Sequence, residues 1–161
     1  VWISSTQPVT AKVVTYYALI DKAQEPVGLY TYGAFDPTRA TTHVALPMLL
    51  GGYEGWHHGY GVYIQNVGEI STTVTLRYVT DDDQVLIEQA VVEPGDVWQP
   101  PPLALAYTHA AATAKADQPI VALVTAQKES SQDNWLAYRG INYVPRKLYL
   151  VYLPISLHIQ P

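Results

Sequence analysis

The sequence predicts an all-β protein, an antiparallel β-sandwich built from about one and a half copies of a repeated module. Three observations predict this fold. Landmarks recur in the same order at a long interval, apolar residues alternate with polar ones, and turn-forming residues separate the alternating runs.

The repeat is clearest in two segments that contain Gln-Pro. SSTQPVTAKVVT at residues 4–15 and KADQPIVALVT at 115–125 both continue into an apolar run that ends in Val-Thr. Two more pairs follow in order: LYTYG at 29–33 resembles LAYRG at 136–140, and VALPML at 44–49 resembles VYLPISL at 151–157. The offset falls from 111 residues to 106 or 107, so we expect a loop about five residues shorter in the second copy.

A period of about 107 residues leaves the chain out of phase with its modules. Residues 1–40 are then the C-terminal strands of one module, 41–145 are a complete module, and 146–161 are the C-terminal strand that begins a third. The chain starts at Val1 and shows no signal peptide. We therefore expect a mature, processed chain or an excerpt of a longer one.

Strands are predicted throughout the complete module. Residues 72–78 alternate, which places Val74, Leu76 and Tyr78 on one face of a half-buried strand. A strand over 61–66 precedes it and another over 85–92 follows it. Turns are predicted at 67–70, 81–84 and 93–96, where Gly, Asp and Pro are concentrated.

The Ala-rich segment 103–116 favours a helix by propensity alone. Its counterpart in the preceding copy, VWISS at residues 1–5, is strand-like. We therefore predict a strand over 112–116 and a loop or single helical turn over 104–111. The strand that follows Gln-Pro is expected to point Ile120, Ala122 and Val124 inward.

The ordered motifs resemble those of a known kind of module. They are Leu-Pro-x-x-Leu at 46–50, Gly-Trp at 55–56, YIQNVG at 63–68, VTLxY at 74–78, Glu-Pro-Gly at 93–95, DQPIVA at 117–122 and YxG at 138–140. This set resembles the tandem immunoglobulin-like modules, of about 100 residues, in secreted or cell-surface proteins of Chloroflexota-type bacteria. The resemblance implies a secreted, non-catalytic immunoglobulin-like β-sandwich that is extracellular or at the cell surface. His57, His58 and the Ala-rich segment depart from the family's pattern and put the local loop structure in doubt.

Composition restricts the partners. The chain has 9 basic and 14 acidic residues and a net charge of −5, which argues against a nucleic-acid partner. Charged residues make up 14%, below the roughly 25% of ordinary soluble domains, as expected of a protein that buries surface against copies of itself or works outside the cell. There is no Cys, and no apolar run of ~18 residues that would span a membrane.

Catalytic, cofactor and metal residues are not assigned, because no candidate group has suitable spacing. The five histidines, at 43, 57, 58, 109 and 158, lack metal-ligand spacing. The triplet at 81–83 supplies carboxylates for calcium, but it lacks the spacing of a calcium loop and favours a hairpin turn. Glu88 with Glu93 or Asp96 could form the carboxylate pair of a glycosidase, although nothing nearby indicates a cleft.

Two functions are compatible with these features. The first is a structural subunit of an extracellular filament, sheath or surface layer, a homopolymer whose copies assemble head-to-tail by β-strand addition. The expected interface residues are Leu148, Leu150, Tyr152, Leu153, Ile155 and Leu157. The alternative is an adhesion or carbohydrate-binding module of a larger surface protein, with Tyr53, Trp56 and Tyr60 as a ligand platform. Core packing or an inter-module seam is the favoured role of these aromatic residues.

Overall fold

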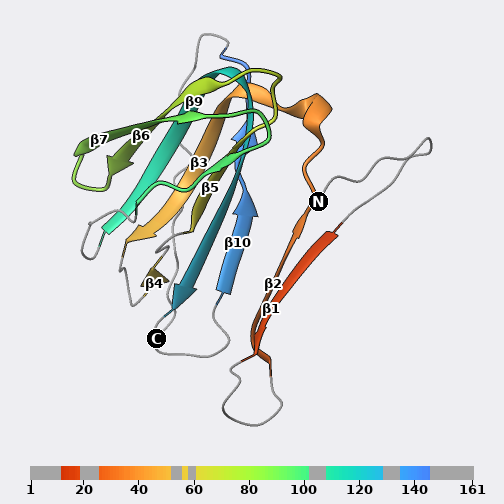
Figure 1. Cartoon of the computed structure of the whole chain (residues 1–161). Helices are drawn as coiled ribbons and strands as arrows, with labels where there is room; N and C mark the ends of the chain where they lie inside the picture. The colour runs from red at the N-terminus through yellow and green to blue at the C-terminus, as the bar shows by residue number, and fades with distance from the viewer. Residues whose placement is uncertain are drawn as a thin grey trace.

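A computed structural model describes residues 12–18, 26–51, 56–57, 61–101, 108–128 and 135–145 (Figure 1). The elements are β1 (Lys12–Ala18), β2 (Pro26–Gly33), the 3-10 helix η1 (Pro37–Arg39), β3 (Thr41–Gly51), β4 (Trp56–His57), β5 (Val62–Asn66), β6 (Thr72–Thr80), β7 (Val85–Val92), β8 (Val97–Trp98), β9 (Thr108–Lys128), β10 (Trp135–Arg139) and β11 (Ile141–Asn142). All pairings among these strands are antiparallel, which confirms the all-β prediction. Within the described residues, no helix has the length and apolar character needed to cross a membrane.

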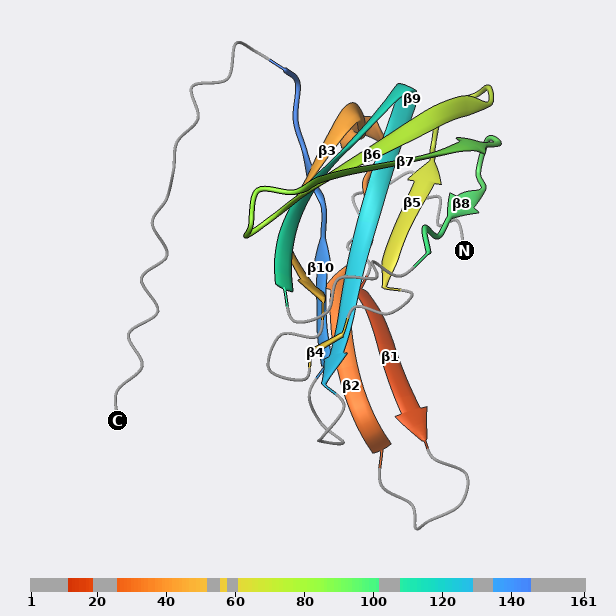
Figure 2. The ribbon, with the colours of Figure 1, turned by 90° about the vertical axis from the view of Figure 1, so that its left-hand side faces the viewer.

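Strand β9 belongs to both layers of a β-sandwich. Its first half pairs with β3 and β6, and its second half pairs with β5 and β10. The ends of β9 lie close together, because Gly51 pairs with both Thr108 and His57, and His57 pairs with Gln127. Figure 2 shows the strand running in one direction and then returning.

The reversal in β9 lies near Pro119, which has no backbone N–H to donate to a neighbouring strand. The backbone N–H of Asp117 donates instead to Thr72 Oγ1 over 3.1 Å. The Pro119 carbonyl accepts from the Val67 N–H over 3.0 Å. These two contacts satisfy backbone groups where the ladder changes partners.

The predicted core residues are buried. Val74, Leu76 and Tyr78 of β6 have at most 1% of their surface exposed, and so do Ile120, Ala122 and Val124 of β9. Both sets belong to one cluster between the layers. The period-two pattern in β6 therefore identified the inner face correctly.

The Ala-rich segment is a strand over more residues than predicted. β9 begins at Thr108, so the loop or helical turn expected over 104–111 is wrong for 108–111, while 104–107 lie outside the described residues. The buried residues alternate as Ala110, Ala112, Ala114 and Ala116. Ala112 pairs with Leu46 on one side and Tyr78 on the other. A small side chain fits between these two large ones, and backbone pairing on both sides outweighs the helix propensity of alanine.

The predicted turns are confirmed in place. The β6–β7 turn occupies the Asp-rich stretch, and Asp83 has a φ of 62°. The turn after β7 contains Gly95 with a φ of 82°, a conformation that glycine adopts without steric cost. β7 begins and ends at the predicted residues, 85 and 92.

The β1–β2 hairpin is a separate two-stranded sheet that lies beside β10 (Figure 1). Its register matches that of β9–β10 under the repeat: Val14 pairs with Thr31, and Val124 pairs with Tyr138. Within the hairpins the loop differs by three residues rather than five. Tyr16 pairs with Leu29, 13 positions on, whereas Ala126 pairs with Leu136, 10 positions on. The rest of the fall in the repeat offset, from 111 residues to 106 or 107, must arise outside these paired segments.

Candidate functional site

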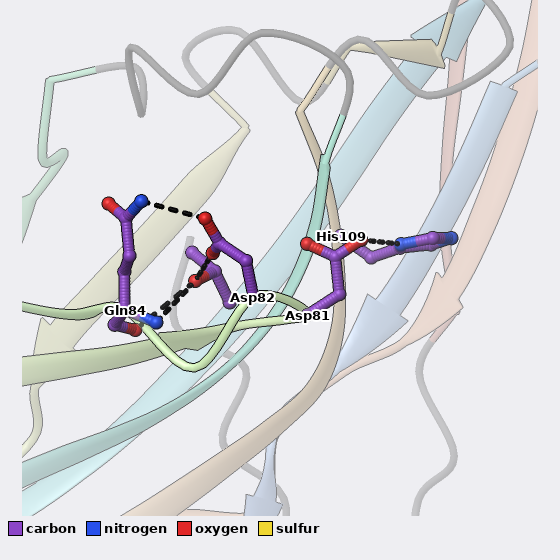
Figure 3. Close-up of polar contacts among 5 residues, drawn as sticks. Asp81, Asp82, Gln84 and His109 are labelled. Carbon is purple, nitrogen blue, oxygen red and sulfur yellow. Dashed lines mark hydrogen bonds and ion pairs between the residues drawn. The ribbon is translucent and has the colours of Figure 1, made fainter.

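A cluster of polar side chains lies at the end of the β6–β7 hairpin (Figure 3). Asp82 accepts from the Thr80 hydroxyl and from Gln84 Nε2, the latter over 2.7 Å. The Gln84 N–H donates to Thr80 Oγ1 over 2.9 Å. The hydrogen bond from the Thr80 side chain is the main cause that lowers the pKa of Asp82. Its carboxylate thus stabilises the turn from within.

Asp81 faces a different element. Its Oδ2 lies 3.1 Å from Nδ1 of His109, at the start of β9, and its backbone N–H donates to the His109 carbonyl over 3.1 Å. Figure 3 shows these two side chains directed toward each other and away from Asp82. The pair joins the hairpin end to β9, with both side chains about half exposed.

The divergence of Asp81 and Asp82 bears on the calcium alternative. The two carboxylates engage different neighbours, Gln84 and His109, rather than one point in space. Within the described residues, no cluster of three or more His, Asp or Glu side chains could hold a metal ion. The Asp triplet forms a hairpin turn, as its composition predicted.

The carboxylates considered for glycoside hydrolysis occupy separate elements. Glu88 lies on β7, where its Oε2 accepts from the Tyr78 hydroxyl over 3.4 Å, whereas Glu93 and Asp96 belong to the following turn. The backbone of that turn pairs with Asn66: Gly95 N–H donates to the Asn66 carbonyl over 2.9 Å. In either candidate pair, one carboxylate, that of Glu88, therefore lies on a strand, and the other lies in a turn whose backbone is bonded to Asn66.

Asn66 is a polar core residue that the sequence did not single out. It is fully buried, and its Nδ2 donates to the carbonyls of Ile70 and Val92 over 2.8 and 2.9 Å. Its Oδ1 accepts from the Gly68 N–H over 2.9 Å. The Asn-x-Gly spacing at the end of a strand was the available signal for this arrangement. Asn66 joins the turn after β5 to the end of β7.

The whole predicted interface and part of the predicted platform lie outside the described residues. This applies to Tyr53 and Tyr60 of the platform, and to Leu148, Leu150, Tyr152, Leu153, Ile155 and Leu157 of the interface. Trp56 lies in β4, where it pairs with Lys128. His43 contacts Tyr143 with ring centroids 5.6 Å apart, and His57 is in β4, while His58 and His158 are outside the described residues.

The residues around β10 are closely packed. Strand β3 shifts register between Leu46 and Leu49, and the Tyr138 hydroxyl bonds both the N–H and the carbonyl of Met48 in that irregularity. Burial raises the pKa of Tyr138 to about 12. A Cβ added at Gly140 would lie 2.3 Å from Val44 Cγ1 and 2.9 Å from Leu46 Cδ2. Gly140 is therefore required by the contact between the end of β10 and β3.

No protein-family model matches the sequence, and no curated protein matches it. One crystal structure, of Thermotoga maritima 1070, is similar, with a TM-score of 0.52 and 11% sequence identity. The similarity covers 65% of this chain and 96% of that chain. At this identity it indicates a shared fold and nothing further.

The repeat equivalent of Gly140 has different surroundings. Gly33, 107 residues earlier, ends β2 as Gly140 follows β10. Among the described residues, the nearest atoms to a Cβ added at Gly33 belong to the Arg139 side chain, at 3.8 Å. Arg139 Nη1 also donates to the Ala34 carbonyl over 3.0 Å, at the junction of the hairpin and β10. The two glycines are equivalent in the repeat, but only Gly140 is packed in the described part of the chain.

Proposed function

We propose that the protein is a structural subunit of an extracellular filament, sheath or surface layer, a homopolymer built from immunoglobulin-like modules whose copies join head-to-tail by β-strand addition. One observation carries this proposal. The β1–β2 hairpin has the register of β9–β10, but residues 34–35, which correspond to β11 by the same offset of 107, have no partner like β3 among the described strands. An unpaired sheet edge of this kind accepts an added strand.

Segment 146–161 is the proposed donor, because VYLPISL at 151–157 repeats VALPML of β3. In β3, Val44 and Leu46 are fully buried and pack at Gly140, whereas Met48 is exposed. The same pattern, moved by 107 residues, directs Val151 and Leu153 toward Gly33 of the neighbouring copy. Ile155 then occupies the exposed position of Met48.

Gly33 provides a specific acceptor for this strand. Its surroundings within the described residues leave room for a side chain, whereas the equivalent Gly140 has none because β3 covers it. A glycine at this position fits a site that a β3-like strand covers in the assembly. The low content of charged residues, 14%, suits a surface that is largely buried between copies outside the cell.

Two changes test the proposal by negative-stain microscopy of the assembled protein. A chain that ends at Pro145 lacks the donor and should not form fibres or sheets. Gly33→Val retains the donor but fills the acceptor site, so it should also prevent assembly while thermal unfolding of the separate subunit is unchanged. Regular assemblies of either variant, formed as readily as by the full chain, would refute strand donation. Binding to a glycan array, lost in Trp56→Ala, would instead support the carbohydrate-binding alternative.

A further inference from the structure

Strand β7 is an edge strand whose protection is limited to one charged residue, Glu88, on its inner face. Among the described strands, β7 pairs with β6 alone, over an uninterrupted register from Thr72–Val92 to Val79–Val85. The sequence VLIEQAVV contains no Pro and no Lys, and its pairing contains no bulge. Natural edges are commonly blocked by these three devices. The outer edge of β7 thus offers unpaired backbone groups along a straight strand.

The side chains of β7 on the outer face are mostly apolar. Val85, Ile87 and Val91 are 47, 61 and 68% exposed. They share one face with Gln89, because alternate residues of a strand point the same way. On the neighbouring strand β6, the paired residues of that face include Thr73, Thr75 and Arg77. Apart from Val79, which is opposite Val85, the apolar stripe therefore lies on the edge strand. This arrangement suits edge-to-edge pairing better than packing of another layer on the face.

We propose that β7 pairs antiparallel with β7 of a second copy, about a two-fold axis at Gln89, so that the two sheets become continuous. This contact is separate from the head-to-tail contact proposed above. A second copy of β7 can pair with this edge because the strand is nearly uncharged: Glu88 is its single charged residue, and its position restricts the register of the pairing. A two-fold axis at Glu88 would place two carboxylates directly opposite each other, which is destabilising.

A shift of the axis by one residue removes that conflict. With the axis at Gln89, Glu88 lies opposite Ala90 of the second copy, and Ile87 lies opposite Val91. The pairing then covers 86–92 of both strands and forms two apolar cross-strand pairs on the outer face. In β7 the even-numbered side chains point to the inner face and the odd-numbered ones to the outer face. The inner faces of the two sheets therefore lie on the same side only if even-numbered residues are opposite even-numbered ones, as they are in this register.

Gln89 has the chemistry that the centre of such a pair needs. Its Nε2 donates to Thr75 Oγ1 over 2.8 Å, which fixes the side chain across the β6–β7 ladder. The amide has a second N–H and a carbonyl oxygen. Two Gln89 amides related by the axis can donate to and accept from each other.

Cysteine cross-linking tests both the contact and its register, because the natural chain has no Cys. Full-length Gln89→Cys, treated with a short bis-maleimide, should yield a covalent dimer on denaturing electrophoresis. Val85→Cys lies on the same face of the same strand but opposite residue 93, about 26 Å from its symmetry mate at about 3.3 Å per residue, and should remain monomeric. Equal yields at both positions, a maximum at Val85 or Ile87, or no dimer with Gln89→Cys would overturn the proposal.

A charge change provides the matched control. Ile87→Lys, introduced into Gln89→Cys, should abolish the cross-link because two lysines would be placed on the paired edge. Ile141→Lys changes a residue of similar exposure, 58% against 61%, on β11 instead, and should preserve the cross-link. The same cross-link should persist in Gly33→Val, which separates this contact from strand donation. Loss of the cross-link in Ile141→Lys, or its retention in Ile87→Lys, would contradict pairing through β7.

Discussion

Gly140 and Gly33 allow one substitution to be compared at two equivalent residues. Gly140→Ala places a methyl group within 2.3 Å of Val44 Cγ1, and β3 cannot move away without disturbing the core, so we expect a loss of about 1 to 3 kcal/mol in the free energy of unfolding. Gly33→Ala meets nothing closer than 3.8 Å among the described residues and should change the free energy of unfolding by less than about 1 kcal/mol. Urea denaturation measures both. Equal losses would show that the two glycines are packed alike.

Individual residues show which core positions could be predicted from the sequence and which could not. Leu76 and Val124 were assigned to the core from period-two alternation alone, and both are buried. Asn66 was not assigned, because a polar residue in a strand gives no indication of whether its partners are water or distant carbonyls. Its partners Ile70 and Val92 become neighbours only when β7 folds back on the end of β5. The hydrogen bonds that close the core depend on tertiary contacts and could not be read from local pattern.

At the scale of the element, β9 shows why its Ala-rich half was hard to place. Alanine occupies both buried and exposed positions there, as in Ala110 and Ala111, so the apolar alternation that identified β6 is hidden. The alternation exists in the structure because β3 and β6 hold the segment between them. Local propensity favoured a helix, and pairing on both sides decided the outcome.

The edge strand β7 carries a titratable group whose state affects stability. Burial raises the pKa of Glu88 above its ordinary value of 4.5, and the hydrogen bond from Tyr78 opposes part of that rise. The folded state therefore binds the proton more tightly than the unfolded state. The free energy of unfolding should fall as the pH rises from about 4.5 through the raised pKa, and then level off.

Glu88→Gln removes this group and should abolish that decline. Relative to the natural protein, the variant should gain more stability at pH 7 than at pH 4, as measured by urea denaturation at both pH values. Glu93→Gln removes the same charge from an exposed turn residue and serves as the control. If Glu93→Gln produced the same pH-dependent gain, the effect would reflect net charge rather than the environment of Glu88.

At the scale of the whole molecule, the predicted repeat agrees with the pairing of two hairpins, which is stronger support than the similarity of any single motif. The match between β1–β2 and β9–β10 extends to individual paired residues, such as Tyr16–Leu29 and Ala126–Leu136. The similar Thermotoga maritima 1070 structure covers 65% of the chain, about the share taken by one predicted module. The described part of the chain thus combines one sandwich with an additional two-stranded hairpin.

A peptide of residues 146–161 should replace the donor when added to the chain that ends at Pro145. β3 pairs with the first half of β9 and with β11, whose counterparts under the predicted repeat are residues 1–5 and 34–35. Strand addition forms new backbone hydrogen bonds, so the peptide should slow amide hydrogen exchange in these two segments of the shortened chain. The β3 pattern specifies which side chains matter: Leu153 corresponds to buried Leu46, and Ile155 corresponds to exposed Met48. The Leu153→Asp peptide should therefore give no protection, because it would bury a carboxylate, whereas the Ile155→Asp peptide should protect nearly as well as the natural one. Equal protection by both variant peptides would mean that the segment does not dock in the manner of β3. Protection confined to β7 would place the donor at the other edge of the molecule.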